Sequence, residues 1–451
     1  MIPPWVLLIF VIGVNFTLWG MVGLARMADQ RLHPAPDLPG PSPRPSPRPS
    51  PRPRERGARV RPDEVAVLMA AHNEELVLAR SLEAITKLVP ADNVHVVSDG
   101  STDRTVELAR AAGVHVIETP TNVGKAGALT EGIRHFELAR RYRAVLLLDA
   151  DTRLDPDYFR AALPLFDDPA VAAVAGCAVT DWESPRKRFV AQLLTAHRSR
   201  IYALVQRLVK FGQAWRLANA VSIVPGFASL YRSGVLPHID INPPGLVIED
   251  FNMTFAVYQQ RLGKVGFCLG ARAMTQDPDR IRDYIRQVKR WALGFWQTIR
   301  RYRPGANLFT AMLGLFAVEL VTASVLMMLV PPVVVLLALP EIVPASADWP
   351  GFGEAYRAVS AHLSLGSVVA GVLLPDLLLT AAVATVEHRP KYLLWAPLFL
   401  LMRAIDAALA LYTLPLAWLR RSDGTWRSPS RRGAPVAGLV TDPVGVSVPD
   451  R

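Results

Sequence analysis

Cysteine and acidic residues are both scarce in this chain of 451 residues. The two cysteines, Cys177 and Cys268, make neither a disulfide framework nor a zinc-type motif. Lysine and arginine outnumber aspartate and glutamate by 50 to 39, for a net charge of +11. Because arginines such as Arg26, Arg31 and Arg300 stand beside apolar runs, we expect this charge to meet anionic membrane lipids rather than nucleic acid.

Four long apolar runs predict membrane-spanning helices. Residues 5–25 form an uncharged run, and about 20 residues at about 1.5 Å each span a hydrocarbon core of about 30 Å. This run lacks the basic start and the cleavage site of a signal peptide. The others lie near residues 308–339, 362–386 and 392–419. By the positive-inside tendency, the arginines at 26 and 31 predict a multi-pass plasma-membrane protein with a cytoplasmic central region. The arginine-rich C-terminal tail conflicts with this tendency, so its side stays open.

The middle of the chain has the pattern of an α/β domain. Short apolar runs predict strands over residues 65–70, 94–97, 114–117 and 144–148, with helices over 76–87, 102–112 and 125–140. This alternation predicts a mostly parallel sheet with helices on both faces and ligands at the carboxyl ends of the strands. Asp99, Asp149 and Asp151 directly follow such ends.

These acidic residues are candidates for binding a nucleotide and a metal. Asp149 and Asp151 offer hard oxygen ligands to Mg²⁺ or Mn²⁺, although Asp-x-Asp is also common turn chemistry. Asp99 is placed to accept hydrogen bonds from a nucleobase or ribose, with Gly100 allowing a close backbone approach. Lys125, in a glycine-containing helix start, favours an anionic ligand.

A basic amphipathic helix is expected before the C-terminal spans. Apolar residues recur at helical spacing between Arg280 and Arg301, with lysine and arginines between them. Such a helix suits a membrane surface, and a packed domain helix is the alternative. Within the spans, Glu319, Asp376, Arg403 and Asp406 are ionisable. They are expected to line a polar path, or Arg403 and Asp406 to pair with each other along one helix.

Six motifs, taken in order, resemble those of a known family. They are Ala71-His-Asn-Glu74, Asp99-Gly-Ser-Thr-Asp103, Asn122-Val-Gly-Lys125, Asp149-Ala-Asp151, Glu249-Asp250 and Gln287-Val-Lys-Arg290-Trp291. Over about residues 64–300 the chain resembles family 2 inverting glycosyltransferases. More narrowly, it resembles the membrane-integrated synthases of poly-N-acetylglucosamine, chitin oligosaccharide, hyaluronan and cellulose. It departs from the pattern at Ser98, where an acid is more usual.

The resemblance implies a fold and a set of site residues. The fold is a GT-A type, Rossmann-like nucleotide-sugar domain inserted between transmembrane helices. Asp250 would be the general base, supported by Glu249, and Asp149 with Asp151 would hold Mg²⁺ or Mn²⁺. The nucleotide-sugar residues would be Asn73, Glu74, Asp99, Lys125 and Asp149. Gln287, Arg290 and Trp291 would complete the catalytic set, and the acceptor residues would be Gly226, Arg232 and Trp291.

The implied activity is processive transfer of a sugar, N-acetylglucosamine being the favoured one, from a UDP-sugar to a growing β-linked polysaccharide. Export through the chain's own transmembrane region would follow, and any accessory partner is unknown. Two alternatives stay open: transfer of one sugar to a membrane lipid, and a catalytically degenerate membrane scaffold.

The predicted organisation follows from these segments. Proline precludes helix in the segment that contains Pro-Ser-Pro-Arg three times, so it is expected to be an extended spacer. The predicted parts are an N-terminal anchor (1–33), a Pro/Arg-rich disordered linker (34–62), a cytoplasmic glycosyltransferase domain (63–275), an amphipathic interface segment (276–304), three transmembrane helices (305–421) and a disordered tail (422–451).

Overall fold

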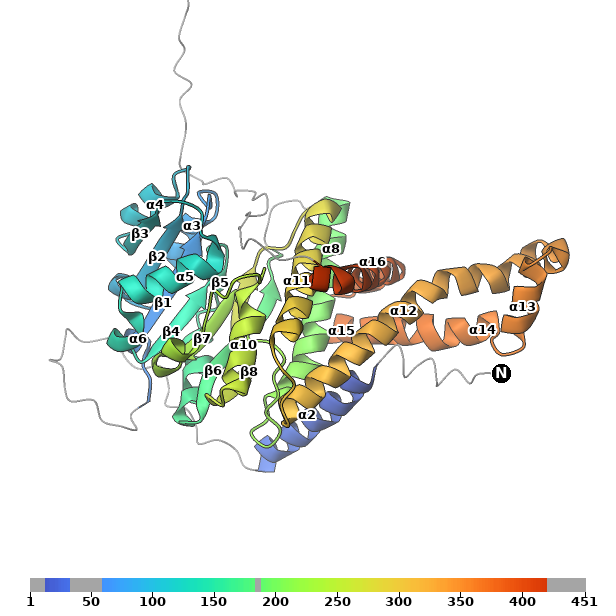
Figure 1. Cartoon of the computed structure of the whole chain (residues 1–451), viewed down its shortest axis with the longest axis horizontal. Helices are drawn as coiled ribbons and strands as arrows, with labels where there is room; N and C mark the ends of the chain where they lie inside the picture. Colours follow the sequence, from blue (N-terminus) through green and yellow to red (C-terminus); the bar gives the residue numbers. More distant parts are fainter. Residues whose placement is uncertain (1–12, 33–58, 183–187, 420–451) are drawn as a thin grey trace, which may run out of the picture.

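A mixed eight-stranded sheet forms the core of the domain on the left of Figure 1. The computed structural model describes residues 13–32, 59–182 and 188–419. The strand order is β3-β2-β1-β4-β7-β6-β8-β5. The strands are β1 (Val65–Ala71), β2 (Val94–Asp99), β3 (His115–Thr119), β4 (Ala144–Leu148), β5 (Arg153–Leu154), β6 (Val171–Thr180), β7 (Ala228–Arg232) and β8 (Lys264–Thr275).

The predicted α/β fold class is confirmed. Strands β3, β2, β1 and β4 run parallel, as the alternating pattern indicates. β7 then enters antiparallel to both β4 and β6, and β8 pairs parallel with β6. The later strands, β5 to β8, were not predicted from the sequence.

Every residue of β1 is buried because helices cover both faces of the sheet. Val65, Val67 and Met69 pack on one side, with α3 (Leu78–Thr86), α4 (Thr105–Ala111) and α7 (Tyr158–Ala162). The alternate residues Ala66, Leu68 and Ala70 pack on the other, with α5 (Gly124–His135), α6 (Leu138–Arg141) and α10 (Glu249–Gln259). Because alternate residues of β1 enter two different cores, both faces of the strand are apolar and β1 reads as a continuous apolar run.

One predicted helix is divided in two. The pattern over residues 125–140 predicts a single helix, but α5 ends at His135 and α6 begins at Leu138. Glu137 between them adopts a left-handed backbone with φ of +50°. A non-glycine residue in this region interrupts a right-handed helix, so the single-helix prediction was wrong at this point.

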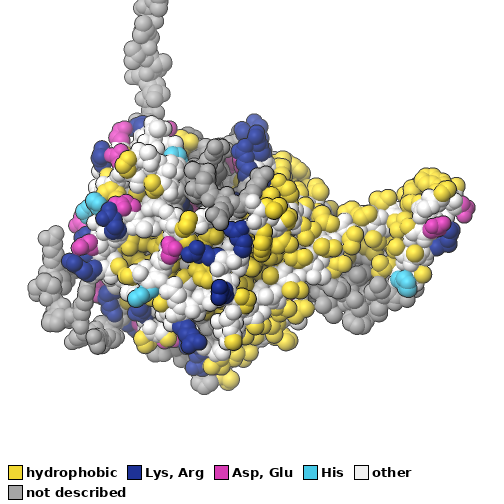
Figure 2. All heavy atoms as spheres, in the orientation of Figure 1, with side chains coloured by type: hydrophobic (Ala, Val, Ile, Leu, Met, Phe, Trp, Pro, Cys, Tyr) yellow, Lys and Arg dark blue, Asp and Glu magenta, His cyan; other side chains and the backbone are white. Residues whose placement is uncertain are grey.

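Among the residues that the structure describes, three segments toward the C-terminus are long and apolar enough to cross a membrane, judged by length and composition. They are α12 (Leu308–Ile342), the segment Leu365–Val386 and α16 (Tyr392–Leu419). The middle segment consists of α14 (Leu365–Val368), a π turn (Val369–Leu373) and α15 (Leu374–Val386), and α13 (Phe352–Ser360) precedes it. Figure 2 shows hydrophobic side chains gathered over these helices and charged ones scattered over the sheet domain.

The N-terminal anchor is described only in part. Helix α2 (Val14–Leu32) covers the second half of the predicted span, and residues 1–12 lie outside the described residues. The predicted linker, apart from residues 59–62, and the predicted tail lie outside them too. Arg26 is buried and donates to the carbonyl oxygens of Phe211 (2.7 Å) and Phe267 (3.0 Å). This arginine therefore fastens α2 to the sheet domain. The expectation that Arg26 contacts anionic lipid headgroups was wrong, because its guanidinium is buried against these carbonyl groups.

Two helices stand between the sheet and the membrane helices (Figure 1). One is α8 (Phe189–Leu204), which continues through a π turn (Val205–Lys210) into α9 (Phe211–Gln213). The other is the predicted amphipathic helix, α11 (Ile281–Arg301). Phe295 and Trp296 of α11 pack against Ala417 of α16 and against α12. Part of the apolar face of α11 is thus covered by the chain itself.

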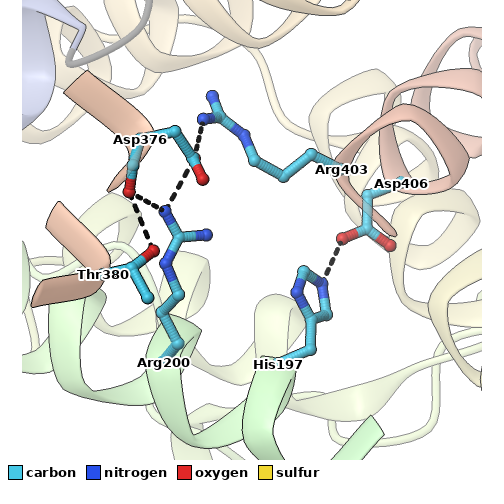
Figure 3. Close-up of polar contacts among 6 residues, drawn as sticks. All are labelled: His197, Arg200, Asp376, Thr380, Arg403 and Asp406. Atoms are coloured by element: carbon cyan, nitrogen blue, oxygen red, sulfur yellow. Dashed lines mark hydrogen bonds and ion pairs between the residues drawn. The ribbon is translucent and has the colours of Figure 1, made fainter. Parts of the chain in front are cut away.

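Ionisable side chains gather among the membrane helices (Figure 3). Asp376 Oδ1 accepts from Arg200 of α8 (2.7 Å) and from Arg403 of α16 (2.6 Å). Asp406 instead accepts from the Tyr284 hydroxyl (2.6 Å) and lies 3.1 Å from His197 Nε2. The predicted pairing of Arg403 with Asp406 was therefore wrong, because each finds a partner on another helix.

Candidate active site

A cavity of about 290 Å³ opens where the carboxyl ends of β1 and β4 meet α8, α10 and α11. Acidic and basic side chains both line it. The acidic ones are Glu74, Asp149, Asp151, Glu249, Asp250 and Asp277, and the basic ones are Lys125, Arg198, Lys210 and Arg290. Gly226, Gln287 and Trp291 complete the set of predicted residues that the fold brings here.

Lys125 bridges two of the acidic motifs. Its Nζ lies 2.7 Å from Asp149 Oδ1 and 2.7 Å from Glu249 Oε1, and it donates to the Gly226 carbonyl at 3.2 Å. Burial alone lowers the pKa of Lys125, but the two carboxylates outweigh burial and the net pKa is raised. The ammonium thus stays charged and ties β4 to the start of α10.

The two carboxylates respond differently to this shared ammonium. Burial raises the pKa of Asp149, and the neighbouring charge of Asp151 adds to the rise, so Lys125 offsets it only in part. Burial acts on Glu249 too, but Lys125 and the nearby Arg290 lower its pKa overall. Asp149 is therefore the carboxylate that gains more from a further cation.

Asp99 lies at the start of α5, next to the segment that carries Lys125. Its side chain is fully buried and accepts from the backbone N–H groups of Val123 (2.7 Å) and Gly124 (2.9 Å) and from the Thr119 hydroxyl (2.9 Å). A carboxylate at these N–H groups stabilises the start of α5, which carries Lys125. Contact of Asp99 with a nucleobase stays a prediction.

Asp250 has the environment of a general base. Its Oδ2 accepts from the Gly226 N–H at 3.2 Å, and its Oδ1 accepts from its neighbour's N–H, that of Phe251, at 2.7 Å. Burial and the adjacent charge of Glu249 raise the pKa of Asp250 to about 6. A carboxylate with this pKa is ionised at neutral pH and is a better proton acceptor than an ordinary aspartate. Gly226 permits the arrangement, because a Cβ there would lie 2.9 Å from both Glu249 Oε1 and Lys125 Nζ.

The Gln-x-x-Arg-Trp residues line the opposite wall on α11. Arg198 of α8 donates to Gln287 Oε1, and its guanidinium lies 4.2 Å from the centre of the Trp291 ring. Arg198 is 3% exposed and lines the cavity, although it was not among the site residues predicted from the sequence. The available signal was the cluster His197, Arg198 and Arg200 within an otherwise uncharged helix.

The remaining predicted residues divide into two groups. Glu74 lines the cavity, and Asn73 lies beside it with an exposed side chain whose Oδ1 accepts from the Thr102 N–H at 2.8 Å. Arg232 is not brought to this place. It lies at the far end of β7, where it donates to the carbonyl oxygens of Val171 (3.0 Å) and Phe166 (3.0 Å). We therefore leave Arg232 out of the acceptor residues.

The residues present fit a divalent cation. No group of three or more histidine, cysteine or acidic side chains that could hold a metal occurs within the described residues. Mg²⁺ usually takes one or two protein carboxylates and completes its shell with substrate phosphates and water. Asp149 and Asp151, both facing the cavity from one turn, supply that number.

Comparison with known proteins agrees with the motifs. Residues 66–239 match the family model of glycosyl transferase family 2. The poly-beta-1,6-N-acetyl-D-glucosamine synthase of Staphylococcus epidermidis is 26% identical over 253 residues, which cover 52% of this chain and 57% of the relative. The synthase of the same description from Staphylococcus aureus strain COL is 25% identical over 243 residues, covering 52% and 56%. The chain thus spans about half the length of the curated relatives that it matches.

Two solved glycosyltransferase structures match the chain at low sequence identity. The mannosyltransferase PcManGT from Pyrobaculum calidifontis, in complex with GDP-Man and Mn²⁺, is 18% identical. The match covers 87% of this chain and 99% of that one, with a TM-score of 0.47. Glucosyl-3-phosphoglycerate synthase from Mycobacterium tuberculosis, in complex with Mn²⁺, UDP and phosphoglyceric acid, is 17% identical over 52% and 77% of the two chains, with a TM-score of 0.35.

Proposed function

We propose that this chain is a processive, inverting glycosyltransferase, and the match of residues 66–239 to the model of glycosyl transferase family 2 supports the transfer of a sugar. It transfers a sugar, N-acetylglucosamine in our proposal, from a UDP-sugar to a growing β-linked polysaccharide. The observation that carries the proposal is the convergence of Asp149, Lys125, Glu249 and Asp250 in one cavity with the Gln-x-x-Arg-Trp helix. A scaffold would need none of these groups.

The donor half of the site is built from the ends of β1 and β4. Asp149 and Asp151 would hold Mg²⁺ or Mn²⁺, which neutralises charge on the diphosphate when bound. The ammonium of Lys125, which lies between Asp149 and Glu249, would stabilise the negative charge that develops on the diphosphate of the leaving UDP. Arg290 supports the same group, since a guanidinium stays charged and offers a planar fork of donors.

The acceptor half lies on α10 and α11. Asp250 takes the proton from an acceptor hydroxyl, whose oxygen attacks the anomeric carbon on the face opposite the leaving UDP and so inverts it. Backbone N–H groups of Gly226 and Phe251 fix the orientation of the carboxylate. Trp291 offers a ring for an acceptor sugar to stack on, and the Arg198 guanidinium lies 4.2 Å from the centre of that ring.

Export through the membrane region is part of the proposal. A second cavity, of about 330 Å³, lies among α2, α8, α12, α15 and α16 and shares Ile201 and Val205 with the catalytic cavity. Its wall includes Arg200, Arg403 and Asp406 (Figure 3). Side chains of both charges suit a neutral chain rich in hydroxyl groups. The product would pass from one cavity to the other, with the sheet domain in the cytoplasm.

Transfer of one sugar to a membrane lipid is the second candidate, because the same membrane cavity also suits a lipid acceptor. The test uses membranes that contain the full chain, labelled UDP-sugars and Mg²⁺ or Mn²⁺. Processive synthesis gives a ladder or a high polymer, whereas lipid transfer gives a single product that organic solvent extracts. Absence of UDP release with every sugar tested refutes both and leaves the scaffold.

The export claim is tested separately by Arg403→Gln, with Arg357→Gln in α13 as the matched control. UDP release is expected to persist, while the polymer becomes shorter or stays on the cytoplasmic side. Unchanged length and export in the Arg403 variant would contradict the path.

A further inference from the structure

Lys210 lines the catalytic cavity, and the mechanism above gives it no task. Its side chain is 5% exposed, and its ammonium lies 5.5 Å from the centre of the Phe267 ring. Within the described residues this ammonium makes no hydrogen bond and no ion pair. Burying a charge without a hydrogen-bonding partner costs free energy. Because the Lys210 ammonium faces a cavity, a bound ligand could supply the missing hydrogen-bond acceptor.

A change of helix type brings Lys210 to the cavity. Val205 and Lys210 begin and end the π turn, and both line the cavity. In a regular α-helix, residues five apart are separated by about 140° around the axis. The wider turn with i→i+5 bonds brings them toward one side, and such single π turns are frequent at functional sites.

The π turn is held to the sheet by Gln206. Its amide oxygen accepts from the Ala178 N–H (2.6 Å) and its amide nitrogen donates to the Ala178 carbonyl (2.9 Å). The pairing of β6 with β8 shifts register just before this point, between Ala175 and Cys177. Two irregular backbones, one in the helix and one in the sheet, thus meet where Lys210 enters the cavity.

We propose that Lys210 is a sugar-binding residue of this site, whose ammonium donates to an uncharged oxygen, a hydroxyl or an amide carbonyl, of the bound sugar. The inference rests on the proposed function. Of the other basic groups that line the cavity, Lys125 is engaged with two carboxylates and Arg198 with Gln287 and Trp291, while Arg290 serves the diphosphate in the proposed function.

Its surroundings favour a neutral ligand over the diphosphate. The Lys210 ammonium packs near the Phe267 ring, and Cys177 and Asp250 are the groups whose charges act on it. Burial lowers the pKa of Lys210 to about 8, which still leaves it protonated at neutral pH. A sugar oxygen beside Asp250 would be positioned by such a donor, whether it belongs to the donor sugar or to the acceptor.

The test compares Lys210→Met, Lys210→Gln and Lys210→Arg with Lys87→Met, which removes an exposed lysine that follows α3. Affinities of the full chain for UDP and for UDP-N-acetylglucosamine are measured by calorimetry. The KM for a β-linked N-acetylglucosamine oligosaccharide is measured by UDP release. UDP affinity reports whether the fold and the nucleotide site are intact, and if the Met variant loses it, the Gln and Arg variants carry the test.

For Lys210→Met we expect UDP to bind normally. One sugar-dependent constant should weaken roughly 10- to 100-fold, the usual effect of losing a hydrogen bond to a charged group. A weaker UDP-N-acetylglucosamine affinity assigns Lys210 to the donor sugar, and a higher oligosaccharide KM assigns it to the acceptor. Lys210→Arg should recover part of the loss.

Unchanged constants in both arms, or a shift of the pH profile alone, would overturn the inference, because Lys210 would then act only through the charge of Asp250. Failure of the unsubstituted chain to bind any UDP-sugar would instead refute the proposed function, and this inference with it.

Discussion

Replacing Asp250 by asparagine tests the proposed chemistry most directly. In the structure each carboxylate oxygen accepts one backbone N–H, from Gly226 and from Phe251. The side-chain amide that Asp250→Asn introduces has a single oxygen and keeps only one of these bonds, and it cannot take a proton from a hydroxyl. The shape of the cavity changes little, since the two side chains are nearly the same size.

The expected loss is large and specific to turnover. A positioned general base contributes roughly 10²- to 10⁴-fold, so Asp250→Asn should lower kcat by that factor. Leaving one buried N–H without a partner costs about 1–3 kcal/mol of folding free energy, which lowers Tm without unfolding the chain. The affinity for UDP should stay near that of the unsubstituted protein.

The pH profile gives a second readout. Because the pKa of Asp250 is raised to about 6, the base is ionised above this value and protonated below it. Transfer should therefore fall as the pH drops through about 6 in the unsubstituted chain. The variant should lose this acidic limb together with its activity.

The assay is UDP release from purified full-length protein between about pH 5 and 8, a range that brackets the titration of the base, beside a binding measurement with UDP. The control is Asp240→Asn, because Asp240 pairs with Arg301 at 3.3 Å on the exposed surface and its loss should change little. Near-normal turnover in Asp250→Asn, or an acidic limb that persists in it, would refute the assignment of Asp250 as the base.

Three further outcomes follow from the same geometry. Gly226→Ala should lower kcat by roughly 10²-fold in a chain that still folds, since its Cβ would displace the Lys125 bridge; normal UDP release would contradict this close approach. EDTA should stop UDP release and Mg²⁺ or Mn²⁺ should restore it, whereas release that persists in EDTA would argue against metal binding by Asp149 and Asp151. Asp376→Ala should destabilise the chain by about 3–5 kcal/mol in detergent, because Arg200 and Arg403 lose their shared carboxylate. Glu354→Ala on exposed α13 is the control for Asp376→Ala, and equal melting temperatures would contradict the ion cluster.

Local patterns in the sequence were enough for the first half of the sheet. Strands β1, β2 and β4 are buried on both faces, so each reads as an unbroken apolar run between turns. The acidic motifs at the ends of β2 and β4 could be found for the same reason. The break at Glu137 could not, because one left-handed residue leaves no periodic trace.

Features that depend on distant partners were missed or wrong. In the sequence, Arg198 resembles any other basic residue of a helix. Its place in the site depends on contacts with Gln287 and Trp291, which lie about 90 residues away on α11. The supposed pair of Arg403 and Asp406 satisfied the helical spacing rule. The spacing rule considers only residues of one helix, whereas Arg403 donates to Asp376, which lies on a different helix.

Helix α11 links the two regions of the molecule by contacts at several levels. Toward the cavity it presents Gln287 and Trp291, while Tyr284 donates to Asp406 of α16 at 2.6 Å. Farther along, Trp296 Nε1 donates to the Ala410 carbonyl of α16 at 3.2 Å. The acceptor wall is thus hydrogen-bonded to a membrane helix, whereas Asp149 and Lys125 are fixed by the sheet and α5. A disturbance of α16 should therefore raise the acceptor KM more than it weakens the affinity for UDP, to whose site α11 contributes only Arg290.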